Sequence, residues 1–163
     1  MIKFPTALLV TGVLVLTACQ SADLNAGSTG LFGYPASSSS LLHARKIEAR
    51  TQFRAENYAA SFDIFKEISE AHPRDSDAWL GLAASADRLQ RFDTADSAYS
   101  RLSSLKPGDP TVYNNLGYSH LLRGNVKTAY AYLAQARQLA PGSRRIANNL
   151  QLIRSRATPK ATR

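Results

Sequence analysis

The chain has very little cysteine: Cys19 is the only one among its 163 residues. A lone cysteine cannot close a disulfide within the chain, and it cannot supply the thiolates of a structural zinc site. The three histidines, His43, His72 and His120, are 29 and 48 residues apart, which matches no metal-binding motif. We therefore predict no metal site and no cofactor, and we interpret all three histidines as surface residues.

Long hydrophobic runs are also missing. A membrane-spanning helix needs about 20 apolar residues. The uncharged run from Ala7 to Ala18 is twelve residues long, and Gln, Ser, Asp and Asn follow it within the next seven positions. The sequence therefore does not predict a helix that crosses a membrane.

Acidic residues are absent from the last third of the chain. All twelve lie at or before Asp109, although the whole chain has a net charge of +8. The basic residues beyond that point are Arg123, Lys127, Arg137, Arg144, Arg145, Arg154, Arg156, Lys160 and Arg163. The positive electrostatic field at this end of the chain favours acidic proteins, anionic lipid headgroups or polyanions as partners. The alternative, that the basic end only aids solubility, stays open.

Catalytic motifs are missing as well. The sequence contains no Gly-x-Ser-x-Gly, no His-Glu-x-x-His and no phosphate-binding glycine loop. The segment Gly124–Thr128 ends in Lys-Thr, but its spacing does not fit a phosphate loop. The carboxylate pairs Asp93/Asp96 and Glu67/Glu70 have the spacing of solvated helix faces. We predict that the protein is not an enzyme and has no small-molecule substrate.

What is present begins at the N-terminus. Lys3, a run of Leu and Val, and small residues before a cysteine have the layout of an exported precursor. The Leu-Thr-Ala-Cys segment that ends at Cys19 resembles the lipobox of bacterial lipoproteins. The resemblance implies that residues 1–18 are a signal peptide and that the Cys19 thiol carries a diacylglycerol. A plain secretory signal, with Cys19 incidental, is the alternative.

The lipobox resemblance also carries an expectation about location. The residue after the cysteine is Gln20 rather than Asp. For a lipoprotein this implies sorting to the outer membrane, with the protein facing the periplasm. Nucleic acid is then not an expected partner. Residues 19–41 read as a lipidated N-terminus and a flexible tether, because residues 20–41 contain six serines and three glycines. A coil of that length spans roughly 25 Å.

A 34-residue period begins near Leu42. Trp79 aligns with Tyr113, and Pro107 aligns with Pro141. A fixed period of this length indicates stacked repeats. The pattern resembles the tetratricopeptide repeat (TPR). In one copy the residues at the positions of the family consensus are Trp79, Leu82, Ala83, Ala95, Tyr99, Leu102 and Pro107. In the next copy they are Tyr113, Leu116, Gly117, Ala129, Leu133, Ala136 and Pro141.

The resemblance implies an all-α TPR solenoid of three helix-turn-helix repeats and a capping helix. The predicted repeats are 42–75, 76–109 and 110–143, the cap is 144–156, and 157–163 is a disordered basic tail. The first copy is degenerate, with Arg45, Glu48 and Ser61 at consensus positions. Asp75–Asp77 and Asp109-Pro110 are typical helix starts, and a proline follows each second helix.

Small residues and turns give the repeats their expected geometry. Ala83 with Ala95, and Gly117 with Ala129, are predicted to lie where the two helices of a repeat approach closely. Short turns at Gln90-Arg91 and Gly124-Asn125 separate the paired helices.

In TPR arrays the first helix of each repeat lines a concave groove that binds peptides. By register, the resemblance places these candidate partner-binding residues in the groove: Lys46, Arg50, Arg54, Leu80, Asp87, Arg88, Asn114, Tyr118, Leu121 and Asn148, with His43, Phe53, Asp77, Ala84, Thr111, Leu122, Arg145 and Leu152 at further groove positions. This mixture suits an extended or helical peptide of acidic character. Asn114 could instead mainly support the backbone, and the basic pattern is too incomplete to predict a carboxylate clamp.

The combination of lipobox and short repeat array resembles the lipoproteins of the tight-adherence (Flp/Tad) pilus, of the TadD type. That resemblance implies a scaffold that binds protein partners, such as secretin or pilus assembly components, and is attached to the membrane through its lipid. One alternative is an adaptor that recruits peptidoglycan enzymes or proteases. Another is a type IV pilus pilotin or an outer-membrane biogenesis subunit.

Overall fold

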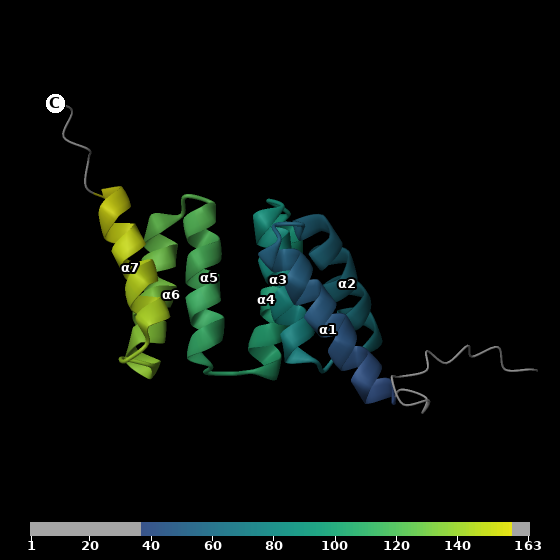
Figure 1. The fold of residues 1–163 in the computed structure, drawn as a ribbon. Coiled ribbons are helices and arrows are strands. Elements are labelled where there is room, and N and C mark those ends of the chain that lie inside the picture. Colours follow the sequence, from purple (N-terminus) through teal and green to yellow (C-terminus); the bar gives the residue numbers. More distant parts are fainter. Residues whose placement is uncertain (1–36, 158–163) are drawn as a thin grey trace, which may run out of the picture. The chain divides into compact units, whose positions relative to one another are not determined.

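The computed structural model describes residues 37–157, and this part of the chain contains seven α-helices and no strand. The helices are α1 (Ser38–Arg54), α2 (Tyr58–Ala71), α3 (Ser76–Arg88), α4 (Phe92–Leu105), α5 (Pro110–Leu122), α6 (Val126–Leu139) and α7 (Arg144–Ala157) (Figure 1). The predicted all-α TPR solenoid is confirmed. The predicted signal peptide, Cys19, most of the tether and the tail beyond Ala157 lie outside the described residues.

Three helical hairpins follow one another along the chain, and α7 packs on the last. Each hairpin is closed by a short turn that contains one residue in the left-handed region: Glu56 (φ 62°), Gln90 (φ 58°) and Gly124 (φ 78°). The turns predicted at Gln90-Arg91 and Gly124-Asn125 are therefore present. Because such turns are short, the two helices of each hairpin run antiparallel and side by side.

Side-chain caps fix where the first helices begin. Asp75 accepts a hydrogen bond from the Ala78 N–H (3.0 Å), and Asp109 accepts one from the Thr111 N–H (2.7 Å), so both predicted helix starts are correct. The start predicted at residue 42 is four residues late. Ser37 caps the Ser40 N–H at 3.2 Å, so α1 begins at Ser38 and takes in part of the segment that was expected to be tether.

Prolines separate the hairpins as the sequence predicts. Helix α2 ends two residues before Pro73, α4 two before Pro107 and α6 two before Pro141. Proline lacks the N–H that would continue the helical ladder, so the chain leaves the helix and turns toward the next hairpin.

The helices within a hairpin touch where their side chains are small. Ala83 and Ala95 are fully buried. A Cβ added to Gly117 would lie 2.6 Å from Leu133 Cγ and 3.1 Å from the Ala129 carbonyl oxygen. No larger residue fits this contact between α5 and α6 unless the helices move apart.

The buried apolar side chains form two clusters. The larger runs from α1 to the start of α5 and includes Phe62, Phe65 and Leu102. The smaller joins Leu121 of α5, Ala129 and Leu133 of α6 and Ile153 of α7. Helix α7 buries Ile146 and Ile153 against the preceding hairpin, as expected of a cap.

A set of polar side chains joins α3, α4 and the end of α5. We call Asp87, Asp96, Tyr99, Ser119 and Arg123 the polar cluster. Arg123 donates to both carboxylate oxygens of Asp96, at 2.8 and 2.5 Å. At the equivalent contact one repeat earlier, Phe62 and Leu89 stand in place of Asp96 and Arg123. At this one position the second and third hairpins are therefore joined by an ionic contact, and the first and second hairpins have apolar side chains there.

Candidate peptide-binding face

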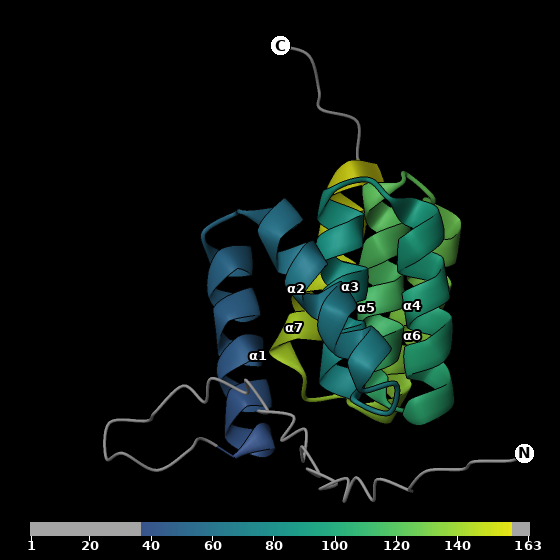
Figure 2. The same ribbon diagram turned by 90° about the vertical axis from the view of Figure 1, so that its right-hand side faces the viewer.

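One face of the described helices is formed by the first helix of each hairpin, α1, α3 and α5, together with α7. We call it the first-helix face. Helices α4 and α6 lie on the opposite side from α1 and α7 (Figure 2). Two hollows open on the first-helix face, one between α1 and α3 and the other between α5 and α7.

The apolar hollow lies between α1 and α3 and has a volume of about 200 Å³. It is lined by Arg50, Phe53, Arg54, Phe65, Asp77, Leu80, Gly81 and Ala84. Phe65 reaches it from α2 because Gly81 has no side chain: a Cβ on Gly81 would collide with the Phe65 ring. The hollow is smaller than a drug-sized site, and it has room for one large apolar side chain.

Two of the cations predicted for the groove are already neutralised. Lys46 donates to Asp75 at 2.8 Å, and Arg50 donates to Asp77 at 3.0 Å. Burial raises the pKa of Asp75, but hydrogen bonds from Lys46 and from the Ala78 N–H outweigh burial and leave that pKa below its usual value. Asp75 is the N-cap of α3 and Asp77 lies in its first turn, so these pairs join α1 to the start of α3.

Aromatic side chains border the apolar hollow at the α1–α2 turn. The Phe53 and Tyr58 rings meet edge to face with centroids 5.2 Å apart. The Arg88 guanidinium lies over the Tyr58 ring at 4.2 Å, a cation–π contact. Arg54, beside the hollow, makes no ion pair within residues 37–157, so its charge is available to a ligand.

The polar hollow lies between α5 and α7 and has a volume of about 340 Å³. It is lined by Pro110, Thr111, Asn114, Ala140, Ser143, Arg145 and Ile146. Asn114 is buried, and its Oδ1 accepts a hydrogen bond from Asn149 Nδ2 at 2.9 Å. Hydroxyls, an amide and the Arg145 guanidinium therefore converge on one hollow, which has the donors that a carboxylate needs.

The ten predicted groove residues divide into several groups. Arg50, Arg54 and Leu80 line the apolar hollow, and Asn114 lines the polar hollow. Tyr118 is half-buried on α5, and Asn148 is exposed on α7. Lys46 and Arg88 are held by Asp75 and Tyr58, as described above.

For two of the ten the groove prediction is wrong. Asp87 is 4% exposed and belongs to the polar cluster, where it accepts hydrogen bonds from Tyr99 and Ser119. Leu121 is 2% exposed and packs in the smaller apolar cluster. Both lie in the last turn of their helix, where the side chains at these register positions are covered by the neighbouring helices.

Sequence reasoning missed Phe65 and Gly81 of the apolar hollow, and Ser143 and Ile146 of the polar one. Phe65 lies on a second helix, so a rule that takes groove residues only from first helices cannot find it. Gly81 is the sequence feature that could have revealed Phe65, because a glycine at this position leaves room for the Phe65 ring to reach the hollow from α2.

Metal-binding clusters and membrane-spanning helices are both absent from the part of the chain that the structure describes. Within 37–157 there is no group of three or more His, Cys, Asp or Glu side chains that could hold a metal ion. None of the helices described is both long enough and apolar enough to cross a membrane.

Comparisons with known proteins agree with this architecture. A family model for the tetratricopeptide repeat matches residues 48–102 and 85–144. No curated protein matches the chain significantly.

Solved structures resemble the chain at low identity. One is the Yersinia enterocolitica type III secretion chaperone SycD in complex with a peptide of the translocator YopD, with 21% identity over 75% of this chain and 98% of that one and a TM-score of 0.62. Another is PcrH in complex with the chaperone-binding region of PopD, with 21% identity, coverage of 76% and 98%, and a TM-score of 0.63. A third is the first TPR domain of Spaghetti (RPAP3) bound to the HSP90 peptide SRMEEVD, with 18% identity, coverage of 71% and 91%, and a TM-score of 0.61.

At these identities the solved structures establish the fold alone. The family match, however, spans more than half of the chain, and the structure has the hairpins, small-residue contacts and capping helix of such an array. The chain therefore belongs to the tetratricopeptide-repeat family.

Proposed function

We propose that this protein is a scaffold that binds a peptide segment of a protein partner on its first-helix face. The segment places one large apolar side chain in the apolar hollow and acidic groups beside Arg54 and in the polar hollow. The observation that carries the proposal is the apolar hollow, where Phe65, Leu80 and Ala84 form an apolar surface next to a cation without an ion pair. Anchors of this kind dominate the binding energy of peptide complexes.

The peptide complexes among the similar folds support this proposal. SycD is in complex with a peptide of the translocator YopD, and PcrH with the chaperone-binding region of PopD. The RPAP3 domain is bound to a peptide that contains two glutamates and an aspartate. An acidic segment suits this chain because Arg54 and Arg145 both border hollows and make no ion pair within the described residues. Charge-assisted contacts of this type are about twice as strong as neutral hydrogen bonds.

The setting in which the scaffold works is part of the same proposal. Its support is the Leu-Thr-Ala-Cys segment: a lipid on Cys19 would anchor the protein to the outer membrane, with the repeats in the periplasm. The partners would then be subunits of an envelope machine, with secretin or pilus assembly components of the Flp/Tad type as the first candidates. The scaffold has no reactive centre in this proposal.

A charge-reversal experiment tests the chemistry of the peptide. The purified chain is screened against synthetic peptides that carry one Phe or Leu flanked either by Glu or by Lys. We expect it to select the acidic set, and Arg54→Glu to weaken that selection. Lys127→Glu, an exposed position on α6 outside both hollows, makes the same change in net charge and should have no such effect. Equal effects of the two variants would mean that only net charge matters, and would overturn the proposed site.

A further inference from the structure

The two ends of the helical stack expose different side chains. At the C-terminal end, α7 exposes Gln151, Arg154 and Ser155 with one leucine, Leu152. At the other end, α1 leaves Leu41 46% exposed and Ile47 49% exposed. Helices α1 and α7 lie at opposite ends of the described part of the chain (Figure 1). Because solenoids need polar outer faces at their ends, the apolar residues of α1 call for an explanation.

These residues form one continuous face. The side of α1 that faces the protein carries Leu42, Ala49 and Phe53. At 100° per residue, the opposite side of the helix carries Leu41, Ala44, Ile47, Glu48 and Thr51, and all five are exposed. We call these five residues the outer α1 face. Ala44 is small and lies between Leu41 and Ile47, so a second helix can approach closely there.

A third hollow, of about 280 Å³, adjoins the outer α1 face between α1 and α2, and Leu41 borders both the hollow and the face. Its apolar lining comes from Leu41, Leu42, Ile68 and Ala71. The exposed apolar surface therefore continues from the outer α1 face onto the end of α2, and is wider than one row of side chains.

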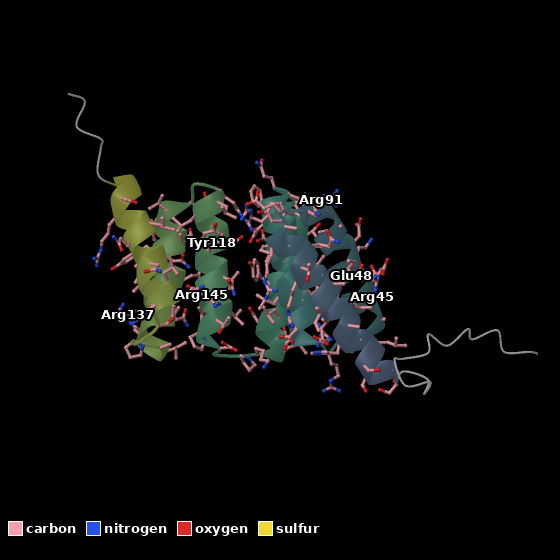
Figure 3. The ribbon with its side chains drawn as sticks, in the orientation of Figure 1. Arg45, Glu48, Arg91, Tyr118, Arg137 and Arg145 are labelled. Atoms are coloured by element: carbon pink, nitrogen blue, oxygen red, sulfur yellow. The ribbon has the colours of Figure 1, made fainter. Side chains whose placement is uncertain are left out.

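Charges along the edge of the face show what kind of surface would fit it. Arg45 pairs with Glu48 at 2.8 Å and with Glu67 at 2.6 Å, and all three side chains are partly open to solvent. Arg45 and Glu48 lie on α1 at the end of the stack away from Arg137 and Arg145 (Figure 3). Because a base and an acid lie one turn apart on the same edge, a second copy of α1 in the reverse direction carries the complementary charges.

We propose that the outer α1 face is a self-association surface on which two copies of this chain pack α1 against α1, antiparallel, about a two-fold axis near Ile47. This arrangement places Ile47 against Ile47 of the second copy. It also brings Arg45 of each copy within one helical turn of Glu48 of the other. A closed two-fold contact of this kind uses the same surface on both subunits.

The contact is small, because it uses one helix and the end of another. Stable interfaces bury about 1,200–2,000 Å² in total, so the dimer should dissociate on dilution. A shared membrane would raise the effective concentration of the two copies. That gain depends on the proposed anchor at Cys19, whereas the pairing itself does not. The pairing also leaves the two hollows of each first-helix face open.

Cysteine crosslinking in intact cells tests both the pairing and its direction. The unmodified chain, with Cys19 as its only cysteine, gives the baseline. Ile47→Cys should give a disulfide-linked dimer on mild oxidation, because the two thiols meet near the axis. Leu41→Cys should not, because antiparallel helices separate these two positions by about 18 Å along the axis, at 1.5 Å per residue. Gln135→Cys on α6 is the exposed control and should also give none.

Each outcome decides the proposal. A dimer band from Ile47→Cys alone supports it. Equal bands from Ile47→Cys and Leu41→Cys would mean that the helices run parallel, and no band from Ile47→Cys would mean that another segment or partner covers this face; either result overturns the proposal. Sedimentation of the purified chain gives a second measurement. Ile47→Glu should at least halve the dimer fraction, and Tyr130→Glu, at an exposed aromatic position on α6, should leave it unchanged.

Discussion

The Ser119 hydroxyl donates a hydrogen bond to the Asp87 carboxylate at 2.7 Å, and this contact joins α5 to α3 across 32 residues of sequence. Tyr99 of α4 donates to the other carboxylate oxygen at 3.0 Å. Burial raises the pKa of Asp87, although both hydroxyls and the nearby Arg123 act in the opposite direction. One buried acid on α3 therefore connects three helices.

Removal of this acid should destabilise the whole array. Asp87→Ala would leave the Ser119 and Tyr99 hydroxyls without their acceptor and Arg123 without a charge 3.9 Å away. Breaking a buried polar network in this way costs about 3 kcal/mol. Urea unfolding of the purified chain measures the loss. Asp87→Asn keeps an acceptor and should lose less; equal losses for the two variants would contradict this account.

His120 should make stability depend on pH near neutrality. Burial lowers its pKa, Arg123 lowers it further, and Asp96 and Asp87 partly oppose them. The unfolded chain, with a histidine pKa of about 6.5, then binds the proton more readily than the folded one. Stability from this residue is fully present above the unfolded pKa and is lost as the pH falls below that value and through the lower pKa of the folded state.

His120→Phe tests this dependence. The ring would keep its stack on Tyr132, 5.5 Å away, and would remove a buried Nδ1 that has no hydrogen-bond partner in the described structure. We expect the variant to gain stability relative to the parent as the pH is lowered from 7.5 to 5.5, followed by thermal unfolding. A difference that stays constant over this range would show that His120 does not titrate differently on folding.

Gly117 should tolerate no larger side chain. Gly117→Val would press on Leu133 and on the Ala129 carbonyl, and overpacking of this kind costs typically about 1–3 kcal/mol. Gly142→Val is the matched control, because a Cβ there meets nothing within 4 Å. Chemical denaturation of both variants should show a loss for the first and a much smaller change for the second. Equal losses would mean that backbone entropy, not packing, sets the effect.

The proposed anchor is tested at Cys19. If this thiol carries the lipid, Cys19→Ser should move the protein from the membrane fraction to the soluble fraction of the cell envelope. Fractionation followed by immunoblotting gives the readout. Membrane retention of the variant equal to that of the parent would exclude lipidation as the means of attachment.

Much of the fold could be predicted from sequence because its rules are local. The prolines after each second helix and the caps at Asp75 and Asp109 act within a few residues, and the 34-residue period shows that these local signals recur. The start of α1 was missed because Ser37 lies in a run of serines that resembles a linker, although a serine is also a good helix cap. The serine-rich composition predicts a linker at these positions, whereas the Ser37 side chain caps a helix, and the structure has the helix.

The candidate site was less predictable because it depends on side chains that meet across repeats. Register alone placed Lys46 and Arg50 on the first-helix face, but it could not show that Asp75 and Asp77 neutralise them. It could not show that Asp87 is buried either, since that depends on hydroxyls 12 and 32 residues away. These contacts change which charges remain for a ligand.

The measurement that tests the central claim most directly is peptide binding after the apolar hollow is filled. Ala84→Phe would place a ring in the hollow, and Ala131→Phe would add the same ring at an exposed position on α6. With the acidic peptides selected by the parent chain, we predict at least a tenfold loss of affinity for Ala84→Phe and no loss for Ala131→Phe. Unchanged binding by Ala84→Phe, with the helical content intact, would contradict the claim that this hollow holds the partner's anchor.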